Sequence, residues 1–226
     1  MYLLSIEKII ENTTLKIDSI TLSELSIEID ITKYDYIIIS GGDGTIRRVL
    51  NKINTFSSLP PLIINPTGSF NVIAKLHRVP KLAHVLHRLE EGQILPTKTQ
   101  NIYKLNEEVF LFSAGNMGDL QHIFLSETLR FGLLEKGIAK YILAVLFLFP
   151  VHIVMTPFML MSKRRFFIFT PLSFIKKFGS FYGKVEEMTI ELENEHNYLE
   201  LDGDLITIET STLSITTFHT LQIVTQ

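Results

Sequence analysis

The sequence predicts an α/β N-terminal three-layer domain followed by an antiparallel β-rich C-terminal domain. Two observations carry this prediction: strands and helices alternate over residues 1–95, whereas apolar and polar residues alternate from Phe166 onward. The pattern changes near Leu95–Gln100, so we place the domains at residues 1–97 and 98–226. The last strands could return to the first domain, and a cleft between two domains is a common place for a ligand.

Short apolar runs and helical spacing define the elements of the first domain. Tyr36–Ser40 is an apolar run beside glycines, which is typical of a strand buried on both faces in a parallel sheet. Thr45 is the expected N-cap of a helix whose apolar residues recur at helical spacing up to Ile53. A second strand and two further helices are expected at Leu62–Ile64, residues 72–76 and residues 82–89.

The second domain is predicted to be antiparallel sheet because its threonine-rich segments alternate apolar and polar side chains. These segments lie around residues 188–192, 199–201, 206–208, 213–215 and 221–223. In one of them Glu200 stands between Leu199 and Leu201, as expected for a strand with one polar and one buried face.

Composition excludes several classes of function. The 226 residues include 21 basic and 24 acidic side chains, and a net charge of −3 argues against a nucleic-acid binder held by phosphate contacts alone. The absence of cysteine excludes disulfides, thiolate zinc sites, iron–sulfur clusters and a cysteine nucleophile. The N-terminus has Glu7 and Lys8 inside its apolar stretch and no basic region before it, so it is a poor signal peptide.

Two segments raise the question of a membrane. Tyr141–Met161 is uncharged and long enough to cross a bilayer, but Pro150 and Pro157 divide it, and its halves also fit a helix followed by a buried strand. The stretch 163–178 interleaves lysines and arginines with phenylalanines, which suits contact with an anionic membrane surface. A pair of strands with solvated lysines explains the second stretch equally well.

The strongest local signal for chemistry is Gly41-Gly42-Asp43-Gly44-Thr45. Glycines after a buried strand let the backbone turn sharply and approach a ligand, and the helix N-terminus that follows suits a phosphate group. A carboxylate beside phosphate is unusual there, so Asp43 either binds a divalent cation or caps the turn. Neither the P-loop pattern nor the dinucleotide fingerprint occurs in the chain.

Two further polar turns accompany this one. Asn65–Asn71 repeats the arrangement of strand, small-residue turn and helix, so Ser69 and Asn71 would face the same crevice and could bond a phosphate or a ribose. In the alternating region, Asp202-Gly203-Asp204 is either a hairpin turn or an acidic pair. In the second interpretation Asp204 accepts a proton from a hydroxyl, while Asp202 orients it or binds metal.

The order and spacing of GGDGT, PTGSFN and LDGD resemble the diacylglycerol kinase catalytic domain family, which includes sphingosine kinases and the bacterial soluble lipid kinases. The segments 110–118 and 132–146 also look like that family, and the resemblance extends over most of the chain. NAD kinases share GGDGT, but PTGSFN and the late LDGD favour the lipid kinases.

The resemblance implies an ATP-dependent transfer of the γ-phosphoryl group to a lipid hydroxyl, of the diacylglycerol or sphingoid type, with Mg²⁺ at the phosphates. ATP would lie in the cleft between the domains, bound by Gly41, Gly42, Asp43, Gly44, Thr45, Ser69 and Asn71. The catalytic residues would be Asp204 as general base, with Asp202 and Asp43. It also implies a cytoplasmic enzyme of phospholipid metabolism, peripheral at the inner membrane face, with no nucleic-acid partner, and edge strands that would allow a homodimer.

Several positions depart from the family pattern. No Asn-Pro and Ser-Gly segment for ATP precedes residue 41, and Arg47 and Arg48 replace a common Asn-Glu pair. Val72 stands where diacylglycerol kinases have an aspartate, and Asp204 stands where the family has a longer glutamate. The alternatives are therefore a catalytically weak lipid or nucleotide binder of this family and an NAD kinase-type enzyme. The metal ligands are not assigned.

Overall fold

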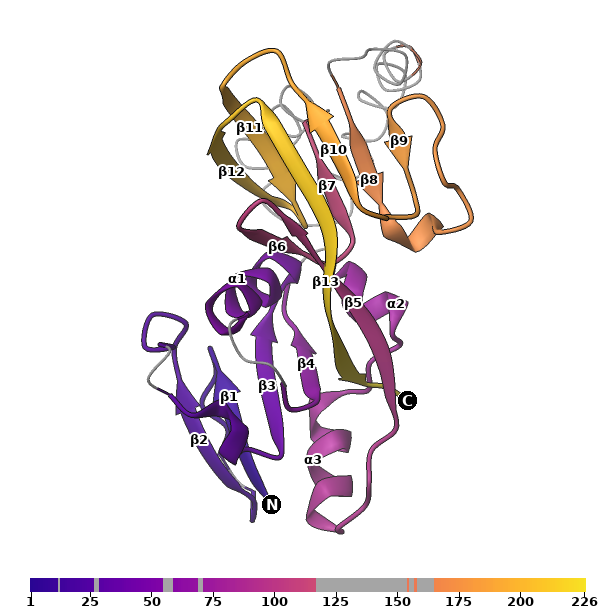
Figure 1. Ribbon diagram of the computed structural model, residues 1–226. Helices are drawn as coiled ribbons and strands as arrows, with labels where there is room; N and C mark the ends of the chain where they lie inside the picture. Colours follow the sequence, from indigo (N-terminus) through magenta and orange to yellow (C-terminus); the bar gives the residue numbers. More distant parts are fainter. Residues whose placement is uncertain are drawn as a thin grey trace, which may run out of the picture. The chain divides into compact units, whose positions relative to one another are not determined.

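The computed structural model describes residues 1–11, 13–26, 29–54, 59–68, 71–116, 154, 157 and 165–226. These residues form two compact units, one of Met1–Leu111 with Ile215–Gln226 and the other of Phe112–Ser214. Each unit is described separately (Figure 1). Most of the apolar stretch 141–161 lies outside the described residues. Among the described residues, no helix combines the length and the apolar content that are needed to cross a bilayer.

The first unit is built on a mixed sheet with the strand order β2-β1-β3-β4-β13-β5-β6. Its strands are β1 (Tyr2–Ile6), β2 (Lys16–Ile20), β3 (Tyr36–Gly41), β4 (Leu62–Pro66), β5 (Thr97–Leu105), β6 (Glu108–Phe110) and β13 (Thr212–Val224). The pairs from β2 through β1, β3 and β4 to β13 are parallel, whereas β5 pairs antiparallel with both β13 and β6. The two predicted buried strands are confirmed as β3 and β4.

Three helices belong to this unit, namely α1 (Asp43–Ile53), α2 (Val72–Leu76) and α3 (Leu82–Glu90), together with a short 3₁₀ turn, η1 (Ile31–Lys33). The helix α1 buries the apolar side that its spacing predicted and contacts β3 and β6. The helix α3 inserts Val85 and Leu89 into a buried cluster with Leu3, Ile38 and Ile63 of the sheet. Burial of such side chains supplies the main free energy that holds helix to sheet.

The prediction that Thr45 caps α1 is wrong. The helix begins two residues earlier, at Asp43, and its N-cap is Gly42, in an extended conformation that lets β3 turn directly into the helix. The Asp43 side chain does not cap its own helix, and its partners are described below.

At the start of the strands, Tyr2, Asp18 and Tyr34 form a hydrogen-bonded cluster. Both tyrosine hydroxyls donate to Asp18 Oδ2, that of Tyr34 at 2.8 Å, and Lys33 Nζ lies 3.9 Å from the same oxygen. Hydrogen bonding to Asp18 raises the pKa of Tyr2 from 10.0 to about 12. Burial, followed by the bond to Asp18, raises the pKa of Tyr34 to about 12 as well. The two donated bonds lower the pKa of Asp18.

The second unit contains a five-stranded sheet with the order β12-β11-β7-β8-β9. Its strands are β7 (Ser113–Gly115), β8 (Phe167–Phe169), β9 (Phe181–Tyr182), β11 (His196–Leu201) and β12 (Asp204–Glu209), with a 3₁₀ turn, η2 (Thr170–Leu172), after β8. A further strand, β10 (Met188–Glu191), pairs with β13. The neighbouring strands are antiparallel except β8 and β9. The predicted fold class, an α/β domain followed by a β-rich domain, is confirmed.

Candidate functional site

The two glycine turns of the first unit touch each other. A Cβ atom added to Gly68 would lie 2.7 Å from Gly42 Cα, and one added to Gly42 would lie 3.3 Å from Gly68 Cα. The backbone N–H of Thr67 also donates to the carbonyl of Gly41 at 3.1 Å. The carboxyl ends of β3 and β4 therefore form one continuous backbone surface, which requires a residue without a side chain at Gly68 and leaves little room for one at Gly42.

Asp43 joins this surface to the helix α2. Its Oδ2 accepts the backbone N–H of Val72 at 2.7 Å, and its Oδ1 accepts that of Ile73 at 3.1 Å. The carboxylate is buried, so these charge-assisted bonds act where water competes little. They also place a negative charge at the N-terminus of α2, where the first N–H groups have no partner within the helix. Of the two interpretations of Asp43, the cap is thus seen directly, but on the second helix.

Asn71 closes the second turn. It adopts a left-handed backbone conformation with φ +48°. Its side chain bonds both the N–H and the carbonyl of Gly68. The Oδ1 atom accepts the N–H of Gly68 at 3.1 Å, while the Nδ2 atom donates to the carbonyl of Gly68. The predicted ligand-binding Asn71 therefore holds the shape of the turn. Ser69, also predicted to bind the ligand, lies outside the described residues.

The start of α1 remains open to a ligand. Gly42, Gly44 and Thr45 are half-exposed, and the first N–H groups of a helix have no partner within it. The Thr45 side chain lies against Gly41, where an added Cβ would come within 2.4 Å of the threonine Cβ. The three glycines and Thr45 are therefore brought together at the end of one strand, in a form that suits an anionic group.

The base of α1 is fixed by side chains that the sequence analysis did not single out as a group. Buried Arg47 donates from Nη1 to Glu108 Oε2 at 2.9 Å, and Asn51 Nδ2 donates to the same oxygen at 2.6 Å. Asn51 also accepts the backbone N–H of Val109 at 3.1 Å. Arg47 replaces a residue of the family pattern, and it anchors α1 to the hairpin of β5 and β6. Arg48, beside it, is exposed and donates to the carbonyl of Gly44 at 3.2 Å.

The acidic motif of the second unit is a hairpin turn. Leu201 pairs with Asp204 across β11 and β12, so Asp202 and Gly203 are the two turn residues, with φ +50° and +90°. Two positive φ values are typical of the type I′ turn, for which Asp-Gly is a favoured sequence. Asp204 therefore begins β12, in a half-buried position beside a fully buried leucine.

Asp202 ties this hairpin to β7. Its carboxylate is 2% exposed, and its Oδ1 accepts the backbone N–H groups of Phe112 and Ser113, both at 2.9 Å. The backbone N–H of Asp202 in turn donates to the carbonyl of Ser113 at 3.1 Å. These bonds orient the turn that presents Asp204, while the catalytic roles expected of Asp202 and Asp204 stay predictions.

Glu200 is a further buried carboxylate in the same hairpin, and sequence reasoning missed it. It is 6% exposed, although the alternation of β11 predicted a polar face at this position. Its Oε1 accepts the Ser113 hydroxyl at 3.1 Å and the backbone N–H of Gly203. The only sequence signal was a third acidic residue, two positions before the Asp-Gly pair.

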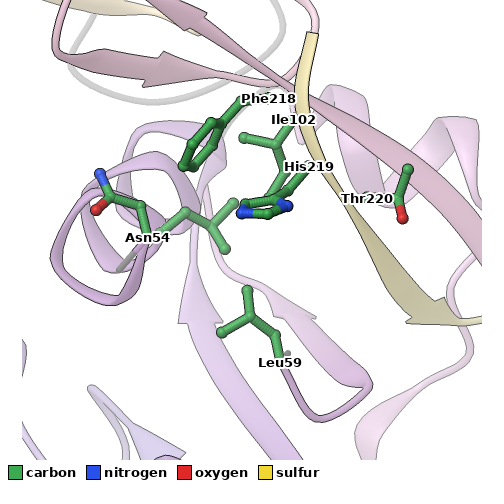
Figure 2. Close-up of a pocket in the computed structure, with 7 residues that line it drawn as sticks. Asn54, Leu59, Ile102, Phe218, His219 and Thr220 are labelled. Atoms are coloured by element: carbon green, nitrogen blue, oxygen red, sulfur yellow. The ribbon is translucent and has the colours of Figure 1, made fainter. Parts of the chain in front are cut away.

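A small pocket of the first unit lies at the other end of α1 (Figure 2). It is lined by Leu50, Asn54, Leu59, Ile102, Phe218, His219 and Thr220. A cavity of about 20 Å³ holds roughly one water molecule, so this pocket is too small for a nucleotide. The described residues also contain no group of three or more histidine, aspartate or glutamate side chains arranged to hold a metal ion.

The two glycine turns lie in a segment that matches a family of known proteins. Residues 6–102 match the diacylglycerol kinase catalytic domain. Over 109 residues the chain is 28% identical to a protein of Streptococcus pneumoniae serotype 4 described as a "putative lipid kinase". That match covers 47% of this chain and 36% of the relative, so it spans about a third of the relative's length.

Solved structures share the fold over the whole chain. Two structures from Bacillus anthracis, described as a "putative diacylglycerol kinase" and as a diacylglycerol kinase, match with TM-scores of 0.55 and 0.56. Each match covers 100% of this chain and 96% of the other, at 15% and 14% identity. The resemblance that the three motifs predicted is confirmed, because residues 6–102, which contain the first two motifs, match the diacylglycerol kinase catalytic domain.

Proposed function

We propose that this protein is an ATP-dependent lipid kinase, which transfers the γ-phosphoryl group of ATP to a lipid hydroxyl. The observation that carries the proposal is the contact between Gly42 and Gly68, held by Asp43 within the region that matches the family. Both turns lack side chains at the contact, so the backbone can lie directly against a phosphate chain. The identity of the lipid, of the diacylglycerol or the sphingoid type, is left to the assay below.

In this proposal Gly41–Thr45 bind the phosphates of ATP. A bound ATP supplies the phosphoryl group, while the backbone N–H groups at the start of α1 orient its negative oxygens. Asp43 acts as a positioning residue, because its two oxygens bond Val72 and Ile73 and thereby hold the second turn against the first. Mg²⁺ remains an expectation from the family, and we assign it no protein ligand.

Asp204 is the proposed general base. It stands at the start of β12, held there by the anchored turn of Asp202 and Gly203. Its carboxylate would take the proton of the lipid hydroxyl as the hydroxyl oxygen bonds to phosphorus. Because a carboxylate base mainly positions the alcohol in phosphoryl transfer, a short aspartate can serve if the hairpin is rigid.

The test is a kinase assay with radiolabelled ATP, Mg²⁺ and a panel of lipids that carry free hydroxyls. Asp204→Asn should lower the rate by roughly 10²–10⁴-fold, since general-base catalysis contributes about that factor. Its melting temperature should stay close to that of the parent protein. Glu209→Gln, at the other end of β12, is the matched control and should retain the full rate. A full rate in Asp204→Asn would show that the base is another residue.

A catalytically weak binder of the same family is the second candidate. It is favoured by the end of β1, where Glu7 adopts φ +71° and no Asn-Pro or Ser-Gly turn follows, and by the short Asp204. This candidate predicts that ATP or lipid binds without turnover. Phosphate transfer to NAD in the absence of lipid would instead identify an NAD kinase-type enzyme.

Location and assembly follow from the same proposal. A kinase for lipids meets its substrate at a membrane surface, so we propose a cytoplasmic protein with peripheral contact to the inner membrane face. No nucleic-acid partner is expected for a chain of net charge −3. Pairing into a homodimer through edge strands stays a prediction, which the mass of the particle in solution will test.

A further inference from the structure

Two phenylalanines protrude from the connection between β8 and β9, which we call the β8–β9 loop (residues 170–180). Phe174 is 82% exposed and Phe178 is 66% exposed. A single exposed apolar side chain is ordinary, but two aromatic rings four residues apart on one short loop leave a large apolar area in water. Lys176 and Lys177 lie between them in the sequence and are exposed as well.

The loop is held in this shape by its backbone. Phe178 and Phe181 exchange two backbone hydrogen bonds, at 2.8 and 2.9 Å. The carbonyl of Ile175 accepts the N–H groups of Gly183 and Lys184 at 3.1 and 2.8 Å. A Cβ on Gly183 would lie 1.9 Å from the carbonyl oxygen of Leu172, so the two ends of the loop are in close contact. The exposure of the rings is therefore imposed by the fold.

A row of rings supports the base of the loop. Phe167 of β8 stacks on Phe181 of β9 at 5.6 Å between centroids, and Phe169 stacks on Phe167 at 6.2 Å. Phe112 meets Phe169 edge to face at 6.1 Å. These four rings are buried or half-buried, in contrast to Phe174 and Phe178.

The positive charge around the β8–β9 loop favours an anionic partner. The described residues 165–187 contain four basic and two acidic side chains, a net charge of +2, whereas the whole chain has 21 basic and 24 acidic ones. Within the loop, Lys177 Nζ lies 5.4 Å from the centroid of the Tyr182 ring. Lys176 and Lys184 share one carboxylate, Glu186, at 3.3 and 3.1 Å. Lys176, Lys177 and Lys184 still outnumber Glu186 and the exposed Glu187 that follows it.

We propose that the β8–β9 loop binds the surface of an anionic lipid bilayer and inserts Phe174 and Phe178 among the headgroups. Rings beside flexible cations suit this surface, because the rings enter the boundary with the acyl chains while the lysines reach the lipid phosphates. A protein partner would need a broad, closely fitting face, whereas the loop offers two separate protruding rings. The proposal rests on the membrane contact expected of the proposed lipid kinase and assigns that contact to this loop. Binding needs neither ATP nor turnover, so vesicle binding and kinase activity can fail separately.

The absence of tryptophan from the chain gives a direct test. The variant Phe178→Trp carries a single fluorophore at the tip of the loop, and Ile94→Trp carries one at an 89% exposed position of the other unit. Each full-length protein is mixed, without ATP, with vesicles of phosphatidylcholine or of phosphatidylcholine and phosphatidylglycerol in equal parts. The emission of Phe178→Trp should shift to the blue with the anionic vesicles, and that of Ile94→Trp should not.

Sedimentation with the same vesicles measures affinity. The double variant Phe174→Ser/Phe178→Ser should bind at least about ten-fold more weakly, since each ring contributes apolar area at the interface. Lys177→Gln should bind the anionic vesicles about five-fold more weakly. The matched control Ile9→Ser/Ile94→Ser, which removes two exposed apolar side chains elsewhere, should bind like the parent.

Three results would overturn the proposal. The first is the absence of the parent protein from the pelleted anionic vesicles. The second is pelleting without a blue shift of Phe178→Trp, which would assign binding to another surface. The third is a blue shift of Phe178→Trp that grows with protein concentration in the absence of vesicles, which would identify a second copy of the chain as the occupant of the loop.

Discussion

The carboxylate of Asp43 accepts the backbone N–H of Val72, 29 residues further along the chain, at 2.7 Å. One side chain of the first glycine turn therefore holds the helix that follows the second turn. The sequence shows two separate polar turns, whereas the structure shows one surface made from both. The predictions below test what each part of this surface and of the acidic hairpin contributes.

The first prediction concerns Asp43. Asp43→Asn replaces one acceptor oxygen by an amide that points its own donors at a backbone N–H. We expect a loss of about 2 kcal/mol in the free energy of unfolding, because a buried charge-assisted bond is lost and one N–H is left without a partner. Urea unfolding measures this loss, and Asp204→Asn is the comparison that should lose little. Equal stability of Asp43→Asn and the parent would show that the bonds from Asp43 to Val72 and Ile73 do not stabilise the fold.

The second prediction concerns the contact between the two turns. In Gly68→Ala the new methyl group would lie 2.7 Å from Gly42 Cα, so the turns must move apart. We expect a cost of about 1–3 kcal/mol in stability and an ATP affinity at least roughly ten-fold weaker by calorimetry. Gly92→Ala is the control: its φ of +73° makes it strained, but nothing lies within 4 Å. It should lose about 1 kcal/mol of stability and keep its ATP affinity.

The third prediction concerns Glu200. Glu200→Ala removes the acceptor of the Ser113 hydroxyl, in β7, and of the Gly203 N–H, in the turn of the hairpin. We expect a loss of about 2–3 kcal/mol and a fall in kcat larger than any change in KM for ATP. Glu200→Gln keeps an acceptor oxygen and should recover most of both. A variant Glu200→Ala with parent stability would show that the hairpin does not need this carboxylate.

The fourth prediction concerns pH. The folded pKa of Tyr2 and of Tyr34 is raised from 10.0 to about 12, so the protonated tyrosines stabilise the fold fully below pH 10. That contribution should be lost as the pH rises from about 10 to about 12. The pKa of Asp18 is lowered, so its contribution is present above the ordinary pKa of 3.8 and is lost as the pH falls through the folded value.

Chemical unfolding of the parent and of Asp18→Asn between pH 3 and pH 11.5 checks both signs. The difference in unfolding free energy between the two proteins should be largest near neutral pH and should shrink toward both limits. Other tyrosines titrate alike in both proteins and cancel in the difference. A difference that is constant across the range would show that the ionisation of Tyr2, Asp18 and Tyr34 is not coupled to folding.

Much of the fold could be predicted from local pattern. Tyr36–Ser40 and Leu62–Ile64 are apolar throughout because strands in the middle of a parallel sheet are covered on both faces, and both became strands. The ends of the strands were harder to predict from the sequence. The two alternating segments at 213–215 and 221–223 are one strand, β13, whose register shifts between Thr217 and His219, and the pattern does not show such an irregularity.

The candidate site was predicted as a set of motifs but not as a set of contacts. Asp202 bonds the backbone of Phe112, 90 residues away, and local periodicity says nothing about partners at that distance. Glu200 shows the same limit. Its carboxylate accepts the Ser113 hydroxyl and the Gly203 N–H, and the sequence pattern around Glu200 does not indicate either bond. The sequence alone does not distinguish a buried acidic residue that accepts backbone hydrogen bonds from one that is exposed to solvent.

The long strand β13 has a consequence for biosynthesis. It lies between β4 and β5 in the sheet of the first unit, yet its residues from Ile215 onward follow the whole second unit in the chain. A growing polypeptide therefore exposes the facing edges of β4 and β5 until residues 215–224 have been made. The sheet of the first unit cannot be completed before β13 has been made. Protection of the open edges of β4 and β5 by a chaperone would therefore matter most in that interval.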